Sequence, residues 1–172
     1  YVFGIDLGYD PDPTAFVIGA YNEFDPNLYI VETFKETKMI ISDVVERIKY
    51  YQKIYPGAYI VVDAADKQAV EEMKQRHGVP LVASEKHGKA GFIELMNSDM
   101  RNGLIKIVGQ ENEDIVEEWQ NLIWDQDSEK RIEDSRYDNH LADGALYLWR
   151  YCYNFLWQNR PKEISIHSEE KT

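Results

Sequence analysis

Short apolar runs of strand length dominate the first part of the chain. The runs at 1–8, 14–22 and 27–34 are rich in aromatic and β-branched residues, and turn segments that contain proline separate them. Runs of this composition between turn signals are typical of β-strands. We therefore predict an antiparallel meander of three strands, of which the first two form a β-hairpin.

Helical patterns alternate with strand patterns farther along the chain. Residues 40–54 carry apolar side chains at steps of three and four, which predicts an amphipathic helix with Ser42 or Thr37 as its N-cap. The run at 58–63 has the continuous apolar pattern of a fully buried strand. The remaining predicted elements are a helix at 66–76 capped by Asp66, a strand at 81–84, a helix near 90–102, a strand at 104–108, a helix near 111–122 and a last helix from about 138 to 157.

Three strands followed by alternating helices and strands indicate an α/β fold. Crossover helices must cover the parallel part of a sheet, so we expect a mixed sheet with an antiparallel opening meander, then parallel βα units, and helices on both faces. This order resembles the ribonuclease H topology, in which the first and fourth strands are neighbours. We expect one domain at residues 1–157 and a flexible C-terminal tail at 158–172, which is polar and interrupted by proline.

Composition narrows the function classes. The 172 residues are 44% apolar, enough for the core of one domain, and carry a formal net charge of −12. Proteins that coat DNA by bulk electrostatics carry an excess of Lys and Arg, so this negative charge argues against that class. It does not exclude an enzyme that acts on nucleic acid, because carboxylates around a metal site add negative charge that bound ions offset.

The single cysteine and the absence of long apolar runs indicate the cellular setting. Cys152 alone excludes an intrachain disulfide and a cysteine-based zinc cluster, so a reducing, intracellular compartment is expected. No apolar run has the length of a membrane span. Because Tyr1 already lies in a strand-like run, we expect a further segment of polypeptide before it.

Three aspartates stand at or near the ends of predicted elements. Asp6 and Asp63 each end an apolar strand, at the point where a side chain leaves the core. Asp143 lies on the last predicted helix, on the same face as Asn139 and His140. In the ribonuclease H topology Asp6 and Asp63 become neighbours, and Asp143 faces them.

Carboxylates in this arrangement suit divalent metal ions. Magnesium prefers oxygen ligands, and two ions about 4 Å apart support the in-line hydrolysis of a phosphodiester. We predict that Asp6, Asp63 and Asp143 hold two Mg²⁺ or Mn²⁺ ions, with Asp6 shared by both ions. Asp12, in the loop after the first strand, is predicted as an additional ligand.

Basic side chains near these acids are candidates for DNA binding. Lys86 and Lys89 could contact the scissile phosphate, and surface lysines at a strand end are the alternative interpretation. His140 could orient Asp143 or contact DNA, although a histidine at the start of a helix is often a plain surface residue.

The charged segment 124–139 lacks sustained apolar periodicity and is predicted to be a loop or hairpin. Its position before the Asp143 helix makes it a candidate flap, with Arg131 and Arg136 available to phosphates. A surface excursion without a function is the alternative.

Each acid also has an ordinary structural explanation. Asp6, followed by glycine and proline, is normal turn chemistry, and Asp63 could satisfy backbone donors of the following helix. An aspartate such as Asp143 on a helix is often solvated. Glu117 and Glu118 are expected on a solvated helix face.

Four segments together resemble the C-terminal nuclease domain of bacteriophage terminase large subunits. They are GIDLGYDPDPTAFVIGA, VVDAAD, ASEKHGKAGFIELM and DNHLADGALYLW. The resemblance spans residues 1 to about 157, and Asn-His-x-x-Asp followed by Gly-Ala-x-x-Tyr is its most specific motif. It implies that the acids matching Asp6, Asp63 and Asp143 are metal ligands.

The same resemblance implies an activity and partners. The implied reaction is endonucleolytic cutting of concatemeric viral DNA during genome packaging in the host cell cytoplasm. The implied partners are double-stranded DNA, an N-terminal ATPase domain of the same polypeptide, a portal and a small terminase subunit. No G-x-x-x-x-G-K-[ST] phosphate loop occurs in these residues, so ATP hydrolysis by them is not expected.

The pattern leaves several alternatives open. Some members of this family carry a second acid next to the last aspartate, where this chain has Ala142, so Asp12 and Asp138 both remain candidates for a fourth ligand. A Holliday-junction resolvase or transposase-like nuclease shares the same superfamily chemistry. A non-catalytic docking module of a packaging motor would keep the fold alone. GIDLG also resembles the first phosphate-binding strand of actin and sugar kinases, which need a duplicated domain and a second glycine-rich turn.

Overall fold

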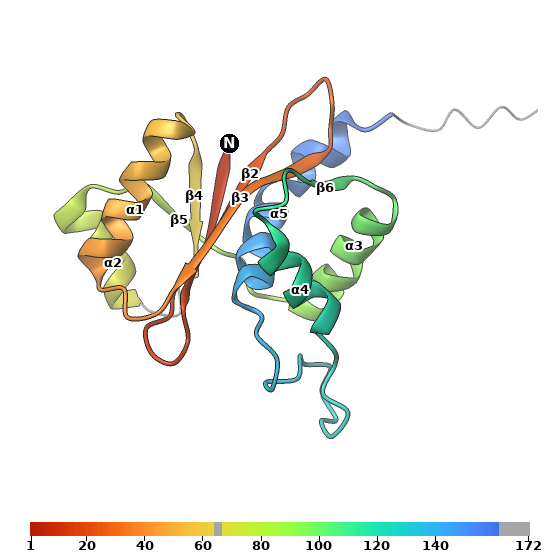
Figure 1. Ribbon diagram of the computed structural model, residues 1–172. Helices are drawn as coiled ribbons and strands as arrows, with labels where there is room; N and C mark the ends of the chain where they lie inside the picture. The colour runs from red at the N-terminus through yellow and green to blue at the C-terminus, as the bar shows by residue number, and fades with distance from the viewer. Residues whose placement is uncertain (64–66, 162–172) are drawn as a thin grey trace, which may run out of the picture.

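A computed structural model describes residues 1–63 and 67–161, and it consists of a central sheet with helices on both faces (Figure 1). The strands are β1 (Val2–Asp6), β2 (Thr14–Ala20), β3 (Leu28–Glu36), β4 (Tyr59–Val62), β5 (Leu81–Ala83) and β6 (Ile105–Ile107). The helices are α1 (Ile41–Ile54), α2 (Lys67–His77), α3 (Lys89–Arg101), α4 (Glu113–Asn121) and α5 (His140–Asn159).

The described strands form one mixed sheet in the order β5-β4-β1-β2-β3-β6. The opening strands β1, β2 and β3 pair antiparallel, whereas β4 pairs parallel with both β1 and β5, and β6 pairs parallel with β3. The predicted meander, the parallel βα units and the adjacency of the first and fourth strands are all confirmed. This is the arrangement expected for a ribonuclease H-like fold.

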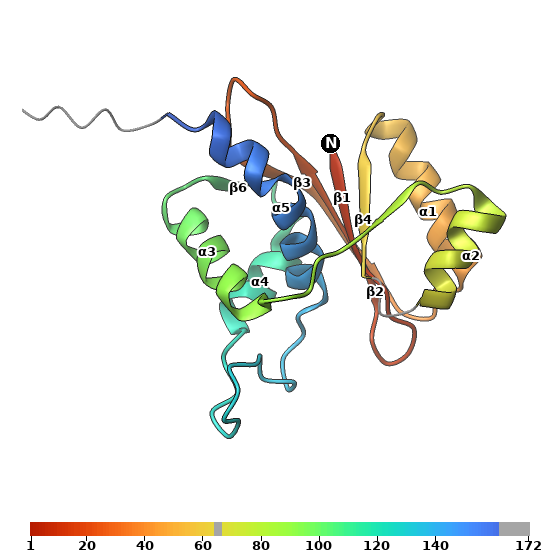
Figure 2. The ribbon, with the colours of Figure 1, turned by 180° about the vertical axis from the view of Figure 1, so that it is seen from behind.

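Helices cover both faces of the sheet because successive side chains of a strand point to opposite sides. In β1, Val2 belongs to the core shared with α3, α4 and α5, whereas Phe3 and Ile5 belong to the core shared with α1 and α2. Figure 2 shows the same three layers from behind. Burial on both sides explains why β1 and β4 read as continuous apolar runs rather than as alternating ones.

The backbone of α5 passes very close to β1 at two glycines. A Cβ atom at Gly4 would stand 1.9 Å from the carbonyl oxygen of Gly144, a separation that real Cβ atoms do not show. Glycine therefore permits this approach. Because Gly144 directly follows Asp143, and Gly4 lies two residues before Asp6, the contact sets how near the helix brings its aspartate to the end of the strand.

Some local expectations were wrong. Ile40 precedes the first turn of α1, and its N–H donates to Asp43 Oδ2 at 3.1 Å, so neither Ser42 nor Thr37 caps the helix. Tyr59 is 54% exposed, so the fourth strand is buried only from its second residue onward. The predicted cap Asp66 lies outside the described residues.

The last helix runs slightly farther than predicted. It ends at Asn159, past the expected domain boundary at 157, and most of the predicted tail lies outside the described residues. No helix in the described part of the chain is both long enough and apolar enough to cross a lipid bilayer.

Candidate metal centre

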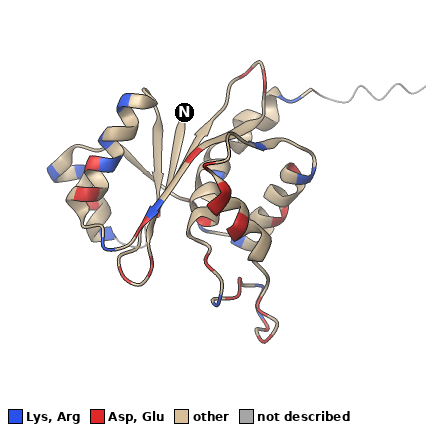
Figure 3. Ribbon diagram, in the orientation of Figure 1, with Lys and Arg blue, Asp and Glu red and all other residues tan. Residues whose placement is uncertain are grey.

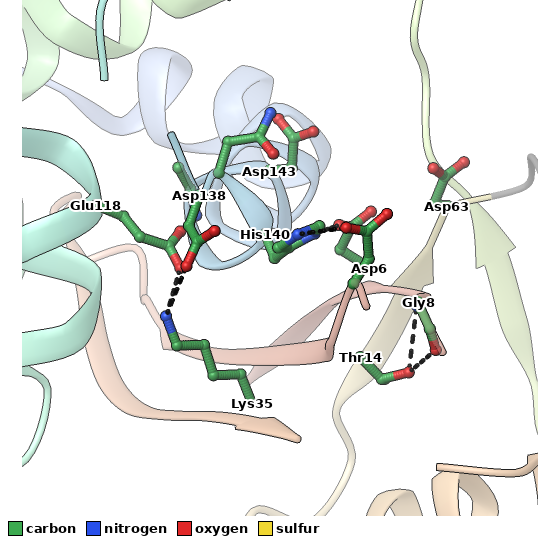
Figure 4. Close-up of polar contacts among 12 residues, drawn as sticks. Asp6, Gly8, Thr14, Lys35, Asp63, Glu118, Asp138, His140 and Asp143 are labelled. Carbon is green, nitrogen blue, oxygen red and sulfur yellow. Dashed lines mark hydrogen bonds and ion pairs between the residues drawn. The ribbon is translucent and has the colours of Figure 1, made fainter. Parts of the chain in front are cut away.

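The three predicted aspartates meet at one end of the sheet. Since β1 and β4 run parallel and in register, Asp6 and Asp63 leave the sheet at the same edge. The first turn of α5 lies across that edge and brings Asp143 to it (Figure 4). Residues that are far apart in the sequence are thus placed together by three different elements.

Two side chains from α5 contact the strand-end carboxylates. The Tyr147 hydroxyl lies 3.4 Å from Asp6 Oδ1 and 3.5 Å from Asp63 Oδ2, so it stands between the two acids. His140 Nδ1 lies 3.0 Å from Asp6 Oδ2. The carboxylate that His140 can orient is therefore Asp6 rather than Asp143.

The two predicted DNA-binding lysines pair with these acids. Lys86 Nζ lies 2.6 Å from Asp63 Oδ2, and Lys89 Nζ lies 2.6 Å from Asp143 Oδ1. Lys89 also contacts Glu133 Oε2 at 2.5 Å. Each strand-end or helix acid is thus bound to a nitrogen donor, either an ammonium group or an imidazole.

The donor set suits hard divalent cations, although side chains must move to admit them. Within residues 1–63 and 67–161, no three Asp, Glu, His or Cys side chains stand in a group that could hold an ion as they are arranged. Lys86 is 49% exposed and can swing away from Asp63 into solvent. The carboxylate oxygens at this sheet edge match the oxygen ligands that magnesium and manganese prefer.

The pKa values of the ionisable groups in this centre are shifted by burial and by their neighbours. Burial raises the pKa of Asp143 to about 6, Glu133 and Asp6 act in the same direction, and Lys89 opposes them. The hydrogen bond with Asp6 raises the pKa of His140. Burial by itself would lower the pKa of Lys89, but Asp143 and Glu133 outweigh it and the pKa is raised. A bound cation would stabilise the charged form of Asp143.

The two candidates for a fourth ligand lie at the rim. Asp12 is 71% exposed at its side chain, and its nearest partner in the centre is His140, whose Nε2 lies 3.7 Å away. The loop that carries Asp12 is closed by Thr14, whose hydroxyl donates to the Gly8 carbonyl at 2.7 Å (Figure 4). Asp138 instead faces Lys35, at 4.0 Å. Asp12 is therefore linked to Asp6 through their common neighbour His140, whereas Asp138 pairs with Lys35.

The sequence reasoning missed Glu133. Its carboxylate shares Lys89 with Asp143 and accepts a hydrogen bond from Asn139 Nδ2 at 3.4 Å. Glu133 lies in the irregular segment between α4 and α5, where no periodicity marks one acid from its neighbours. An antiparallel bridge to Trp124 holds it in place. The predicted loop or hairpin is thus a loop with a single bridge.

The two predicted arginines of this segment are held differently. Arg131 pairs with Glu94 and lies over the Trp124 ring at 4.8 Å from its centroid. It lines a groove of about 450 Å³ that also contains Asp12, Lys89 and His140. Arg136 donates to Asp134 and borders a different hollow beside α4. The structure therefore brings Arg131, but not Arg136, into the groove beside the acids.

Acidic side chains are common at this end of the molecule. Figure 3 shows them in the loop after β1, on α4 and along the segment between α4 and α5. Among them, Glu117 is exposed as predicted, but Glu118 is buried, so the expectation of a solvated Glu118 was wrong.

A curated relative matches most of the chain, although no family model does. The chain is 25% identical over 155 residues to the terminase large subunit of Bacillus phage SPP1, and the match covers 84% of this chain and 34% of that protein. The chain thus spans about a third of the length of this relative.

Solved structures share the fold. The large terminase nuclease domain of bacteriophage SPP1 with bound Mn has a TM-score of 0.70 at 21% identity, covering 87% of this chain and 85% of that chain. The large terminase nuclease of thermophilic phage G20c with bound magnesium has a TM-score of 0.70 at 18% identity, covering 87% and 80%. The P22 large terminase nuclease domain has a TM-score of 0.67 at 12% identity, covering 93% and 86%. These matches confirm the ribonuclease H-like fold and the resemblance to large terminase nuclease domains.

Proposed function

We propose that this chain is a metal-dependent endonuclease that hydrolyses DNA phosphodiester bonds by a two-metal mechanism and cuts concatemeric viral DNA during genome packaging. The observation that carries the proposal is the convergence of Asp6, Asp63 and Asp143 at one edge of the sheet. The bound Mn of the SPP1 nuclease domain and the bound magnesium of the G20c nuclease support a divalent cation at this edge.

The ligands follow from the order of the acids along the edge. Asp6 lies between its contacts to His140 and Tyr147, next to both other acids, so it is the proposed ligand of both Mg²⁺ or Mn²⁺ ions. Asp63 and Asp143 would each complete one ion's ligand set, with Asp12 as an additional ligand. When bound, such ions lower the pKa of water and offset charge on a phosphate.

The chain's own residues have separate tasks in this proposal. His140 holds the Asp6 carboxylate in a fixed orientation through its 3.0 Å contact. Lys86 and Lys89 neutralise the acids until cations arrive and are then available to DNA phosphates, where a positive charge stabilises the charge that develops during hydrolysis. Burial of Asp143 keeps water from competing for its carboxylate.

DNA binding is proposed along the groove beside the acids. Lys89, Arg131 and His140 line this groove, and Lys86 pairs with Asp63 at the same edge of the sheet. Arg136 would contact the duplex farther out. Phosphate contacts do not read bases, so binding through these groups would give cleavage with little sequence preference.

The wider biological setting is part of the proposal. The match to one third of a terminase large subunit supports an N-terminal ATPase domain in the same polypeptide, together with a portal and a small terminase subunit as partners. Double-stranded DNA would be the substrate, and the host cell cytoplasm during phage infection would be the site of action.

Cleavage of supercoiled plasmid tests the proposal. The wild-type chain should nick and linearise plasmid in Mg²⁺ or Mn²⁺ and not in EDTA. Asp6→Asn, Asp63→Asn and Asp143→Asn should each reduce the rate by about a hundredfold or more, because several kcal/mol of charge stabilisation are lost. Asp127→Asn is the matched control, since this aspartate is exposed on the loop before α5.

Two results would overturn the assignment. One is cleavage at the wild-type rate by all three variants, and the other is cleavage that persists without a divalent metal. Strong preference for a four-way junction over linear duplex would instead favour a resolvase.

A further inference from the structure

Glu118 is a buried carboxylate on the apolar side of α4. It is 4% exposed, and it lies one turn after Ile115, which is fully buried. A carboxylate in such a position is costly unless charged or hydrogen-bonded partners compensate for the lost water. Its neighbour Glu117 has the same chemistry but faces solvent.

The two oxygens of Glu118 connect three elements. Oε1 lies 3.1 Å from Lys35 Nζ on β3, and Oε2 accepts a hydrogen bond from the Ala142 N–H of α5 at 3.0 Å. Figure 4 shows Glu118 and Lys35 beside the first turn of α5. Both oxygens are thus used, and neither contacts the aspartates of the metal centre.

The hydrogen bond from Ala142 to Glu118 satisfies a backbone N–H in the first turn of α5, which in most helices bonds to the side chain of the N-cap residue. The first N–H groups of a helix have no partner inside it, and a side chain at the N-cap normally accepts one of them. In α5 the N-cap Asn139 makes no such bond. Glu118 supplies the acceptor from another helix, and its negative charge at the helix N-terminus is favourable.

We propose that Glu118 is a positioning residue for the metal centre. The inference rests on the proposed function. His140, Asp143 and Tyr147 all project from the first two turns of α5. The contact between Gly4 and Gly144 sets how near this helix lies to β1, and Glu118 fixes the rotation of its first turn by holding Ala142. Release of that turn would move Asp143 and His140 relative to Asp6.

Variants at two adjacent positions test this role. Glu118→Ala removes the acceptor, and Glu118→Gln keeps one acceptor oxygen for Ala142, so it serves as the conservative variant. Glu117→Ala and Glu117→Gln make the same charge changes on the exposed face of the same helix. The measurements are Mn²⁺ affinity by titration calorimetry, kcat and KM on a DNA duplex, and thermal stability for all five proteins.

We expect Glu118→Ala to weaken Mn²⁺ binding by about tenfold and to lower kcat, as is typical when a residue that orients a metal ligand is removed. KM for DNA should change less than kcat, because Glu118 itself does not line the groove and only His140 among the groove residues lies in the turn that Glu118 holds. Glu118→Gln should lie between the wild type and Glu118→Ala, and both Glu117 variants should match the wild type.

The outcomes separate the two proposals. A wild-type chain that neither binds Mn²⁺ nor cleaves DNA would refute the proposed function before any variant is compared. If the wild type is active and Glu118→Ala only lowers thermal stability, with Mn²⁺ affinity and kcat unchanged, Glu118 is a stabilising residue and the inference is wrong.

Discussion

Replacing Gly4 by alanine is expected to disrupt the contact between β1 and α5. The new Cβ would lie 1.9 Å from the Gly144 carbonyl oxygen, whereas ordinary contacts begin at about 3.4 Å. Strand and helix must therefore separate by about 1.5 Å at this point, because both sides of the contact are backbone and neither can rotate away. Overfilling a core typically costs 1–3 kcal/mol, and rigid backbone on both sides places this change at about 3 kcal/mol or more.

Two other glycines provide matched comparisons. At Gly144 the nearest atoms to a new Cβ are Val17 Cγ2 at 3.1 Å and the Gly4 carbonyl oxygen at 3.2 Å, which small shifts can relieve. The higher helix propensity of alanine offsets part of that cost, so Gly144→Ala should stay within about 1 kcal/mol of the wild type. At Gly91, in α3, a Cβ would meet nothing within 4 Å, and Gly91→Ala should stabilise by up to about 1 kcal/mol.

Urea unfolding followed by tryptophan fluorescence measures these differences. Trp149 is fully buried and donates to Asp99 at 3.0 Å, so its emission reports the loss of the core around α5. The free energies of unfolding should rank Gly91→Ala highest and Gly4→Ala lowest. A Gly4→Ala protein within about 0.5 kcal/mol of the wild type would refute the claim that backbone proximity at this point positions α5.

Two further predictions concern ionisable side chains. Lys86→Met should raise Mn²⁺ affinity about two- to fivefold, because the half-exposed Lys86 ammonium no longer competes with the cation for Asp63; unchanged or weaker binding in calorimetry would contradict this. Burial and a hydrogen bond to Glu32 raise the pKa of Tyr55 to about 12, from about 10 in an unfolded chain. The folded state therefore favours the protonated phenol. The contribution of Tyr55 to the free energy of unfolding is complete below pH 10 and is lost as the pH rises toward 12. Urea midpoints should fall more steeply between pH 10 and pH 12 for the wild type than for Tyr55→Phe, and parallel profiles would count against the assignment.

The order of the strands and helices could be predicted from the pattern of apolar residues. Apolar runs and helical steps record local burial, and for that reason the predicted strands and helices agree with the structure to within a few residues. Three strands followed by alternating units allow few sheet orders, so the adjacency of β1 and β4 could be inferred without coordinates. Asp6 and Asp63 were then placed together by their positions at the ends of two parallel strands.

Tertiary structure alone decided what surrounds those acids. Three contacts of the site join residues from separate parts of the chain. They are the hydrogen bond of the buried Glu118 to Ala142, the pairing of Lys89 with both Asp143 and Glu133, and the contact of His140 with Asp6. No periodicity in the chain encodes such pairs, because periodicity reports which face of an element is buried and not which partner it meets. The close approach at Gly4 is of the same kind: glycine permits it, but only the packing of α5 across β1 makes it necessary.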